Sequence, residues 1–152
     1  MINDNISVKG VVSFVLKDAE GNIKEHHDHN LVVRTGLAYI VSRMKDTSAG
    51  VMTHMALGTS TVAAAATDTA LGAEVANGRS VLASTTIVTT TFLNDSLQYV
   101  AAFPAGTATG ALTEAGLFSA STGGTMLART VYPVINKGAL DTLTITWKIT
   151  VV

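Results

Sequence analysis

The chain has 152 residues, contains no cysteine, and carries ten basic and eleven acidic side chains, for a net charge of −1. This length fits one domain with a sizeable core, and the absence of cysteine excludes disulfides and thiolate metal sites. Balanced charge provides no attraction to nucleic-acid phosphates or anionic membranes, so neither is an expected partner. With only 14% charged residues, the surface suits a subunit that has protein neighbours.

The first expected elements form a β-hairpin. Apolar and polar residues alternate from Val8 to Lys17, which indicates a strand. Turn-forming residues follow at 18–22, so Ile23 to His29 should return as the partner strand.

Residues 1–7 are expected to form an extension that the core does not explain. Their polar character is unlike a signal peptide, and no apolar run approaches the roughly 20 residues of a membrane span, so synthesis in the cytoplasm is expected.

A change of period predicts one short helix over residues 35–46. Thr35 is the expected N-cap, basic residues in the last turn suit the negative end of the helix dipole, and a stop is expected at residues 48–50. The helix should cover part of the sheet core with an apolar stripe formed by Leu37, Ile40, Val41 and Met44.

A long loop is predicted over residues 58–78, after a short strand from Val51 to Leu57. The segment is rich in alanine, threonine and glycine and has no sustained periodicity. Alanine leaves a helix possible at residues 62–66, although the neighbouring threonines weaken that interpretation. Loops of this length are uncommon inside a compact domain and usually contact something, so this one is a candidate binding region.

The rest of the chain is almost entirely strand-like. Together with the first hairpin, about eight short strands separated by turns predict a single domain over residues 1–152 with an all-β, mainly antiparallel sandwich or jelly-roll-like barrel. The last strand alternates most strictly, with its threonines and Lys148 on the wet face. Its core face should consist of Leu143, Ile145, Trp147, Ile149 and Val151. The other expected strands are 81–92, 97–103, 112–118 and 126–132.

The densest group of metal-ligating residue types is the run of His26, His27, Asp28 and His29. Imidazole and carboxylate can bind zinc and other divalent metals. On a strand, however, His26 and Asp28 share one face while His27 and His29 share the other, so no three of these side chains converge. No metal is therefore expected, unless one histidine from each of three subunits meets on a trimer axis.

No pattern predicts an enzyme or a cofactor. The chain lacks a Gly-x-Ser-x-Gly elbow and a Cys–His pair, and its carboxylates are scattered. Glu114 lies between apolar neighbours, where a carboxylate needs a backbone donor or a cation such as Arg129 or Arg79. A structural anchor is the expected role of Glu114, and Gly116 in the same strand predicts a bulge or a close backbone approach.

Six phrases of the sequence, taken together in their order and spacing, resemble a module found in structural proteins of tailed bacteriophages. Such modules occur in tail or collar fibres and in small cement proteins that decorate capsids. The resemblance covers most of the chain from Asn30 onward. The phrases occupy residues 30–36, 54–59, 67–75, 113–118, 123–130 and 141–147.

This resemblance implies a capsid decoration protein, a homotrimer on the outer capsid surface of the virion whose partner is the major capsid protein. A fibre would add heptads or repeats, and the chain has neither. A tail, collar or fibre-attachment protein remains the alternative, and a carbohydrate-binding or hydrolase-like β-sandwich is the third hypothesis. The expected capsid contacts lie in the extension and the long loop, at Ile2, Asn5, Thr61, Asp68, Leu71 and Glu74.

Overall fold

The computed structural model describes residues 5–45 and 50–152, which form nine strands and one helix. This confirms the all-β fold class with one short helix. Most of the helix stop expected at residues 48–50 lies outside the described residues, as does Ile2. The elements are β1 (Val8–Lys17), β2 (Ile23–His29), β3 (Leu31–Val32), α1 (Arg34–Lys45), β4 (His54–Gly58), β5 (Glu74–Val88), β6 (Ser96–Phe103), β7 (Gly110–Phe118), β8 (Met126–Lys137) and β9 (Thr142–Val151).

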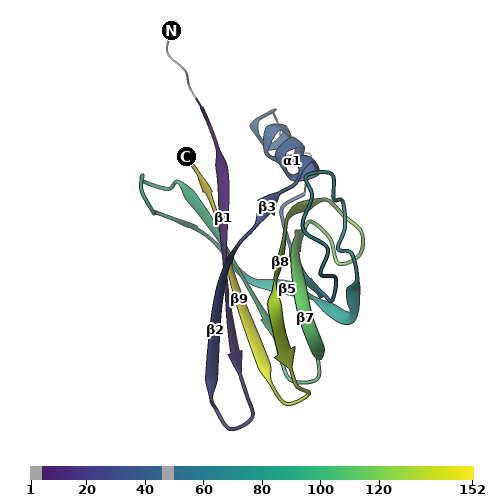
Figure 1. The fold of residues 1–152 in the computed structure, drawn as a ribbon. Helices are drawn as coiled ribbons and strands as arrows, with labels where there is room; N and C mark the ends of the chain where they lie inside the picture. Colours follow the sequence, from purple (N-terminus) through teal and green to yellow (C-terminus); the bar gives the residue numbers. More distant parts are fainter. Residues whose placement is uncertain (1–4, 46–49) are drawn as a thin grey trace.

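All the strands belong to one antiparallel sheet in the order β2-β1-β9-β6-β5-β4-β7-β8-β3. The sheet curls into a nearly closed barrel (Figure 1). β9 lies between β1 and β6, where Trp147 is paired with Val12 on one side and with Tyr99 on the other. The predicted core face of β9 is confirmed from Leu143 to Ile149, whereas Val151 at the strand end is exposed.

The barrel closes at Asn30, between β2 and β3, which are consecutive in the chain but lie at opposite edges of the sheet. The Asn30 N–H donates to the Gly10 carbonyl oxygen over 3.3 Å, and the Thr130 hydroxyl on β8 donates to the carbonyl oxygen of His29 over 3.0 Å. The Trp147 indole N–H donates to Asn30 Oδ1 over 2.9 Å. A Cβ at Gly10 would overlap the Asn30 side-chain amide, so this closure needs glycine there.

The start of α1 differs from the expected one. The helix begins at Arg34, and the first turn closes with the Leu37 N–H donating to the Val33 carbonyl oxygen over 3.0 Å, which makes Val33 the N-cap residue. The predicted N-cap at Thr35 is therefore wrong. Thr35 lies inside the first turn, and its hydroxyl donates to the Met126 carbonyl oxygen over 2.9 Å, fixing the helix to β8.

The buried face of α1 also differs from the predicted stripe. Gly36 is the buried residue of the helix, and a Cβ there would collide with the backbone of Leu127. Because the helix backbone approaches β8 at this glycine, Tyr39 and Ile40 turn toward the core. The prediction was right for Ile40 and wrong for the exposed residues Leu37, Val41 and Met44.

β5 begins at Glu74, well before the strand start expected at Val81. Its first half pairs with β4, in a register that sets Ala56 against Arg79 and, beyond an irregularity, Gly58 against Glu74. Its second half pairs with β6, so this one strand joins the two halves of the sheet. The long loop therefore spans residues 59–73, and it contains no helix, so the helical interpretation of residues 62–66 is wrong.

Candidate functional site

Both ends of the long loop are bound to one buried side chain, Glu114 on β7. This carboxylate is 0% exposed and accepts backbone N–H bonds from Ser60 (3.2 Å), Gly72 (3.0 Å) and Ala73 (2.7 Å). A buried carboxylate is costly unless such donors surround it. The expected anchoring role of Glu114, including its backbone donors, is confirmed.

Arg129 on β8 joins Glu114 to the middle of the loop. Its Nε and Nη2 both donate to Glu114 Oε2, over 3.0 and 2.8 Å. Nη1 donates to Asp68 Oδ2 over 2.7 Å, and Nη2 also donates to the Val62 carbonyl oxygen over 3.1 Å. Although burial opposes the charge, the hydrogen bonds to Asp68 and Glu114 raise the pKa of Arg129 above its usual value. Arg129 is therefore the cation that Glu114 was expected to find.

Arg79, the other cation considered for Glu114, instead binds Glu74, the first residue after the long loop. Its guanidinium donates to the Glu74 carboxylate over 2.9 and 2.7 Å, and to the carbonyl oxygens of Ala120 (3.1 Å) and Gly123 (2.9 Å). It also lies 3.9 Å from the ring centroid of Phe118, a cation–π contact. The start of β5 is thus tied to the β7–β8 turn.

An apolar contact completes the anchoring of the loop. Leu71 packs against a small buried cluster that includes Phe118, and it lies over Gly116 on β7. A Cβ at Gly116 would come within 3.0 Å of Leu71 Cδ2 and 2.9 Å of the Phe118 ring. Gly116 itself pairs regularly with Ala56 and Arg129, so the predicted bulge is not at this residue. The absence of a side chain at Gly116 instead allows Leu71 of the loop and Phe118 of β7 to pack closely over this position.

The expected contact residues fall into two groups. Asn5 and Thr61 are exposed. Asp68, Leu71 and Glu74 already have partners within the chain, through Arg129, the small apolar cluster and Arg79. Besides Thr61, the exposed surface of the loop includes Val62, Ala63, Thr67 and Thr69.

The histidine run lies on β2 as the alternation predicts. His26 and Asp28 share a face, where His26 Nε2 lies 3.3 Å from Asp28 Oδ2, while His27 and His29 are exposed. The centroid of the His26 ring is 6.4 Å from that of Tyr132 on β8, a strand that does not pair with β2. Within residues 5–45 and 50–152, no group of three or more metal-ligating side chains is placed to hold an ion.

The β5–β6 hairpin has a tip ordered by one carboxylate. Asp95 accepts the backbone N–H groups of Thr90 (2.9 Å), Thr91 (2.8 Å) and Phe92 (2.8 Å), together with the Thr90 hydroxyl (2.8 Å). These bonds, that of Phe92 first, hold the pKa of Asp95 well below its usual 3.8, although desolvation opposes them. The ordered tip presents Phe92, 66% exposed, and Leu93, 83% exposed.

Replacing Asp95 is expected to loosen this tip. In Asp95→Asn, NMR order parameters of residues 90–94 should fall from about 0.85 toward 0.6. Because the folded-state pKa of Asp95 is depressed, its contribution is present above pH 3.8 and is lost as pH falls through the folded value. Wild-type protein should therefore loosen at the tip on acidification below pH 3.8. Asp18→Asn, which removes the matching cap of the β1–β2 turn, should leave residues 90–94 ordered.

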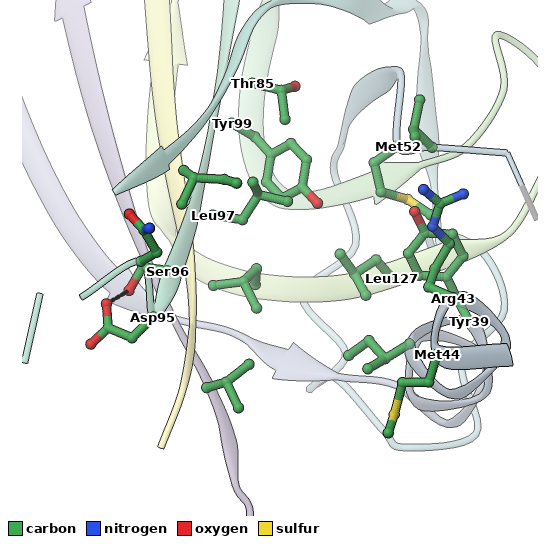
Figure 2. Close-up of a pocket in the computed structure, with 16 residues that line it drawn as sticks. Tyr39, Arg43, Met44, Met52, Thr85, Asp95, Ser96, Leu97, Tyr99 and Leu127 are labelled. Atoms are coloured by element: carbon green, nitrogen blue, oxygen red, sulfur yellow. Dashed lines mark hydrogen bonds between the residues drawn. The ribbon is translucent and has the colours of Figure 1, made fainter. Parts of the chain in front are cut away.

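An apolar groove lies between α1 and the β5–β6 hairpin (Figure 2). Its volume is about 690 Å³. Leu97 and Tyr99 line it from β6 and Leu127 from β8, while Ile87 and Met44 line it from β5 and the helix. Met44 is 82% exposed. A groove of this size and lining can receive apolar side chains or a small apolar molecule.

Neither the groove nor the apolar tip was predicted from the sequence. The groove is formed by elements far apart in the chain, and its position depends on how Gly36 docks the helix. The tip did carry a local signal. Phe92 and Leu93 sit in a turn directly before Asn94 and Asp95, where apolar residues have no core to enter.

Among the described residues, no helix is both long enough and apolar enough to cross a membrane. Comparison of the chain with protein-family models, curated proteins and solved structures finds no match.

Proposed function

We propose that the chain is a virion structural protein, a decoration protein that binds the assembled major capsid protein shell of a tailed bacteriophage and stabilises it from outside. The observation that carries this proposal is the anchored loop. Residues 59–73 have no regular secondary structure, yet Glu114, Arg129 and Leu71 fix them against the sheet. A loop held in one conformation loses little conformational entropy on binding, so it suits recognition of a repeated protein surface.

The mechanism requires no chemical step. A ligand that binds the assembled lattice, but not the separated subunits, stabilises the lattice by mass action. Several linked copies of the ligand multiply this effect without strong individual contacts. The homotrimer that the resemblance implies would provide such linkage.

The buried ionisable groups support a structural role. Glu114 and Arg129 are saturated by the loop and by each other. Lys137 is also buried, and its ammonium group donates to the Pro104 carbonyl oxygen over 3.0 Å, which ties the β6–β7 loop to the end of β8. Burial lowers the pKa of Lys137, with Asp141 opposing the shift. Each of these groups has a structural bond that accounts for its position.

The aromatic side chains favour protein contact over sugar binding. A carbohydrate site commonly uses exposed rings as a stacking platform. The chain has one tryptophan, three tyrosines and four phenylalanines, all in the described residues, and Phe92 is the exposed one. A single ring at a hairpin tip resembles an anchor for a protein partner more than a sugar platform.

Labelling of phage particles tests the proposed location. Purified protein carrying an electron-dense tag, added to particles that lack the native copy, should appear by negative stain at many sites over the head. Label confined to the neck or tail would overturn the decoration role and support the tail or collar alternative. In the same assay, Val62→Glu should weaken shell binding roughly tenfold or more, as expected for a charge in an apolar contact. Leu140→Glu, at an exposed turn away from the loop, is the matched control.

A further inference from the structure

Two apolar features of the chain remain uncovered near one end of the barrel. The first is the apolar tip, Phe92 and Leu93, at the end of the β5–β6 hairpin. The second is the groove between α1 and that hairpin, the helix–hairpin groove. Figure 1 shows the teal hairpin projecting from the body of the molecule, with α1 on the other side of the C-terminus. One feature projects and the other is hollow, and both are apolar.

We propose that the apolar tip of one copy inserts into the helix–hairpin groove of a second copy. The contact joins two different surfaces of the same chain. It forms either a reciprocal two-fold dimer, in which each tip enters the groove of the other copy, or a head-to-tail contact. Head-to-tail contacts form closed rings when the rotation between neighbours closes, and open chains when it does not.

The tip has the properties of an interface anchor. Large aromatic side chains that enter a partner's pocket commonly dominate binding energy. Asp95 fixes the tip backbone through Thr90, Thr91 and Phe92, so little order has to be gained on binding. Exposing two adjacent large apolar side chains at 66% and 83% is unfavourable in water, and insertion would remove that cost.

The groove is better suited to apolar side chains than to a polar small molecule. Small-molecule sites commonly add a few convergent polar groups that orient the ligand. Here the Asp95 carboxylate at the groove edge already caps the hairpin and accepts a bond from the Ser96 hydroxyl over 2.9 Å (Figure 2). Tyr99 is largely buried, and burial raises the pKa of its hydroxyl, so it stays neutral. Arg43, Thr85 and Asn94 also line the groove, but most of its lining residues are apolar, so its main attraction is apolar burial.

The tip alone cannot supply a stable interface. One aromatic side chain buries about 150–250 Å², whereas stable interfaces bury roughly 1,200–2,000 Å² in total. Further contact is available on α1, where Met44 lines the groove and Val41 on the same helix is exposed. The second copy therefore covers both the groove and part of the helix face that the barrel leaves in solvent.

Light scattering of the purified chain after size exclusion tests this contact, and no shell is required, so the result is separate from the shell-binding test. Wild-type protein should be an oligomer. Phe92→Asp/Leu93→Asp on the tip and Ile87→Asp in the groove should each raise the dissociation constant at least 100-fold and give folded monomers, with circular dichroism spectra like that of wild type. Leu140→Asp, at an equally exposed apolar residue, should remain oligomeric.

Mixing the two monomeric variants tests whether the tip pairs with the groove. The tip variant keeps an intact groove and the groove variant keeps an intact tip, so an equimolar mixture should form a one-to-one complex. Because the chain has no cysteine, Leu93→Cys and Met44→Cys can also be mixed and joined by a short bismaleimide reagent. The crosslinked product should contain one copy of each variant, and Leu140→Cys in place of either should give none.

Three results would overturn the contact. They are a monomeric wild-type chain at about 100 µM, an oligomer whose mass survives both the tip and the groove substitutions, and a monomer that fills the groove with a fatty acid such as laurate. The last result would assign the groove to a small apolar ligand instead.

Discussion

Arg129→Met is expected to destabilise the protein by about 3–5 kcal/mol, because it leaves the buried Glu114 carboxylate without its cation. For a domain of this size the unfolding temperature should fall by roughly 10 °C or more. The loss should be concentrated in the long loop, since Arg129 also holds Asp68 and the Val62 carbonyl oxygen. Hydrogen exchange should accelerate at the Gly72 and Ala73 amides, which donate to Glu114.

Asp68→Asn is the matched control for this substitution. Asp68 accepts the Ala65 N–H over 2.8 Å and pairs with the same arginine, but its side chain is partly exposed. Solvent screening should limit the cost to about 1 kcal/mol or less. If Arg129→Met were no more destabilising than Asp68→Asn, and left the exchange rates at Gly72 and Ala73 unchanged, the buried pair would not anchor the loop.

Trp147→Ala should destabilise the protein by about 3–5 kcal/mol through loss of a fully buried aromatic side chain. Trp147 lies between Val12 and Tyr99 on the neighbouring strands, at the centre of the β1–β9–β6 part of the sheet. The substitution also removes the indole N–H that donates to Asn30 Oδ1, and Asn30 is the residue at which the barrel closes. Urea unfolding should be followed by circular dichroism, because Trp147 is the only tryptophan.

Trp147→Phe separates the hydrogen bond from the bulk of the ring. It keeps most of the apolar volume but leaves Asn30 Oδ1 without the indole donor, beside an Nδ2 that has no partner among the described residues. The expected cost is about 1–3 kcal/mol, the penalty for a buried polar group that loses its partner. Equal stability of Trp147→Phe and wild type would show that the indole–amide bond does not contribute to closing the barrel.

The sequence predicts best those features that depend on local pattern. The alternation of β9 correctly places Leu143, Ile145, Trp147 and Ile149 in the core, because successive side chains on a strand point to opposite faces. The role of Glu114 follows from a single residue, since a carboxylate among apolar neighbours has to find donors. The division of His26 and Asp28 from His27 and His29 is likewise a direct result of strand geometry.

Features that depend on tertiary contact escaped prediction. Periodicity indicated the helix but chose the wrong face for Leu37, Val41 and Met44, because the approach of Gly36 to Leu127 decides how α1 rotates. The early start of β5 depends on pairing with β4 across the long loop, a contact that no local pattern encodes. The helix–hairpin groove depends on this docking of the helix, since α1 forms one of its walls and Thr85 and Ile87 of β5 contribute to another.

The most direct test of the proposed role is co-sedimentation of the purified protein with assembled capsid shells that lack it, alongside unassembled major capsid protein. Saturable binding to shells, no binding to free subunits and a higher disruption temperature of the decorated shell are the predicted results. A protein that stays in the supernatant with shells, or binds free subunits equally well, would contradict the decoration role.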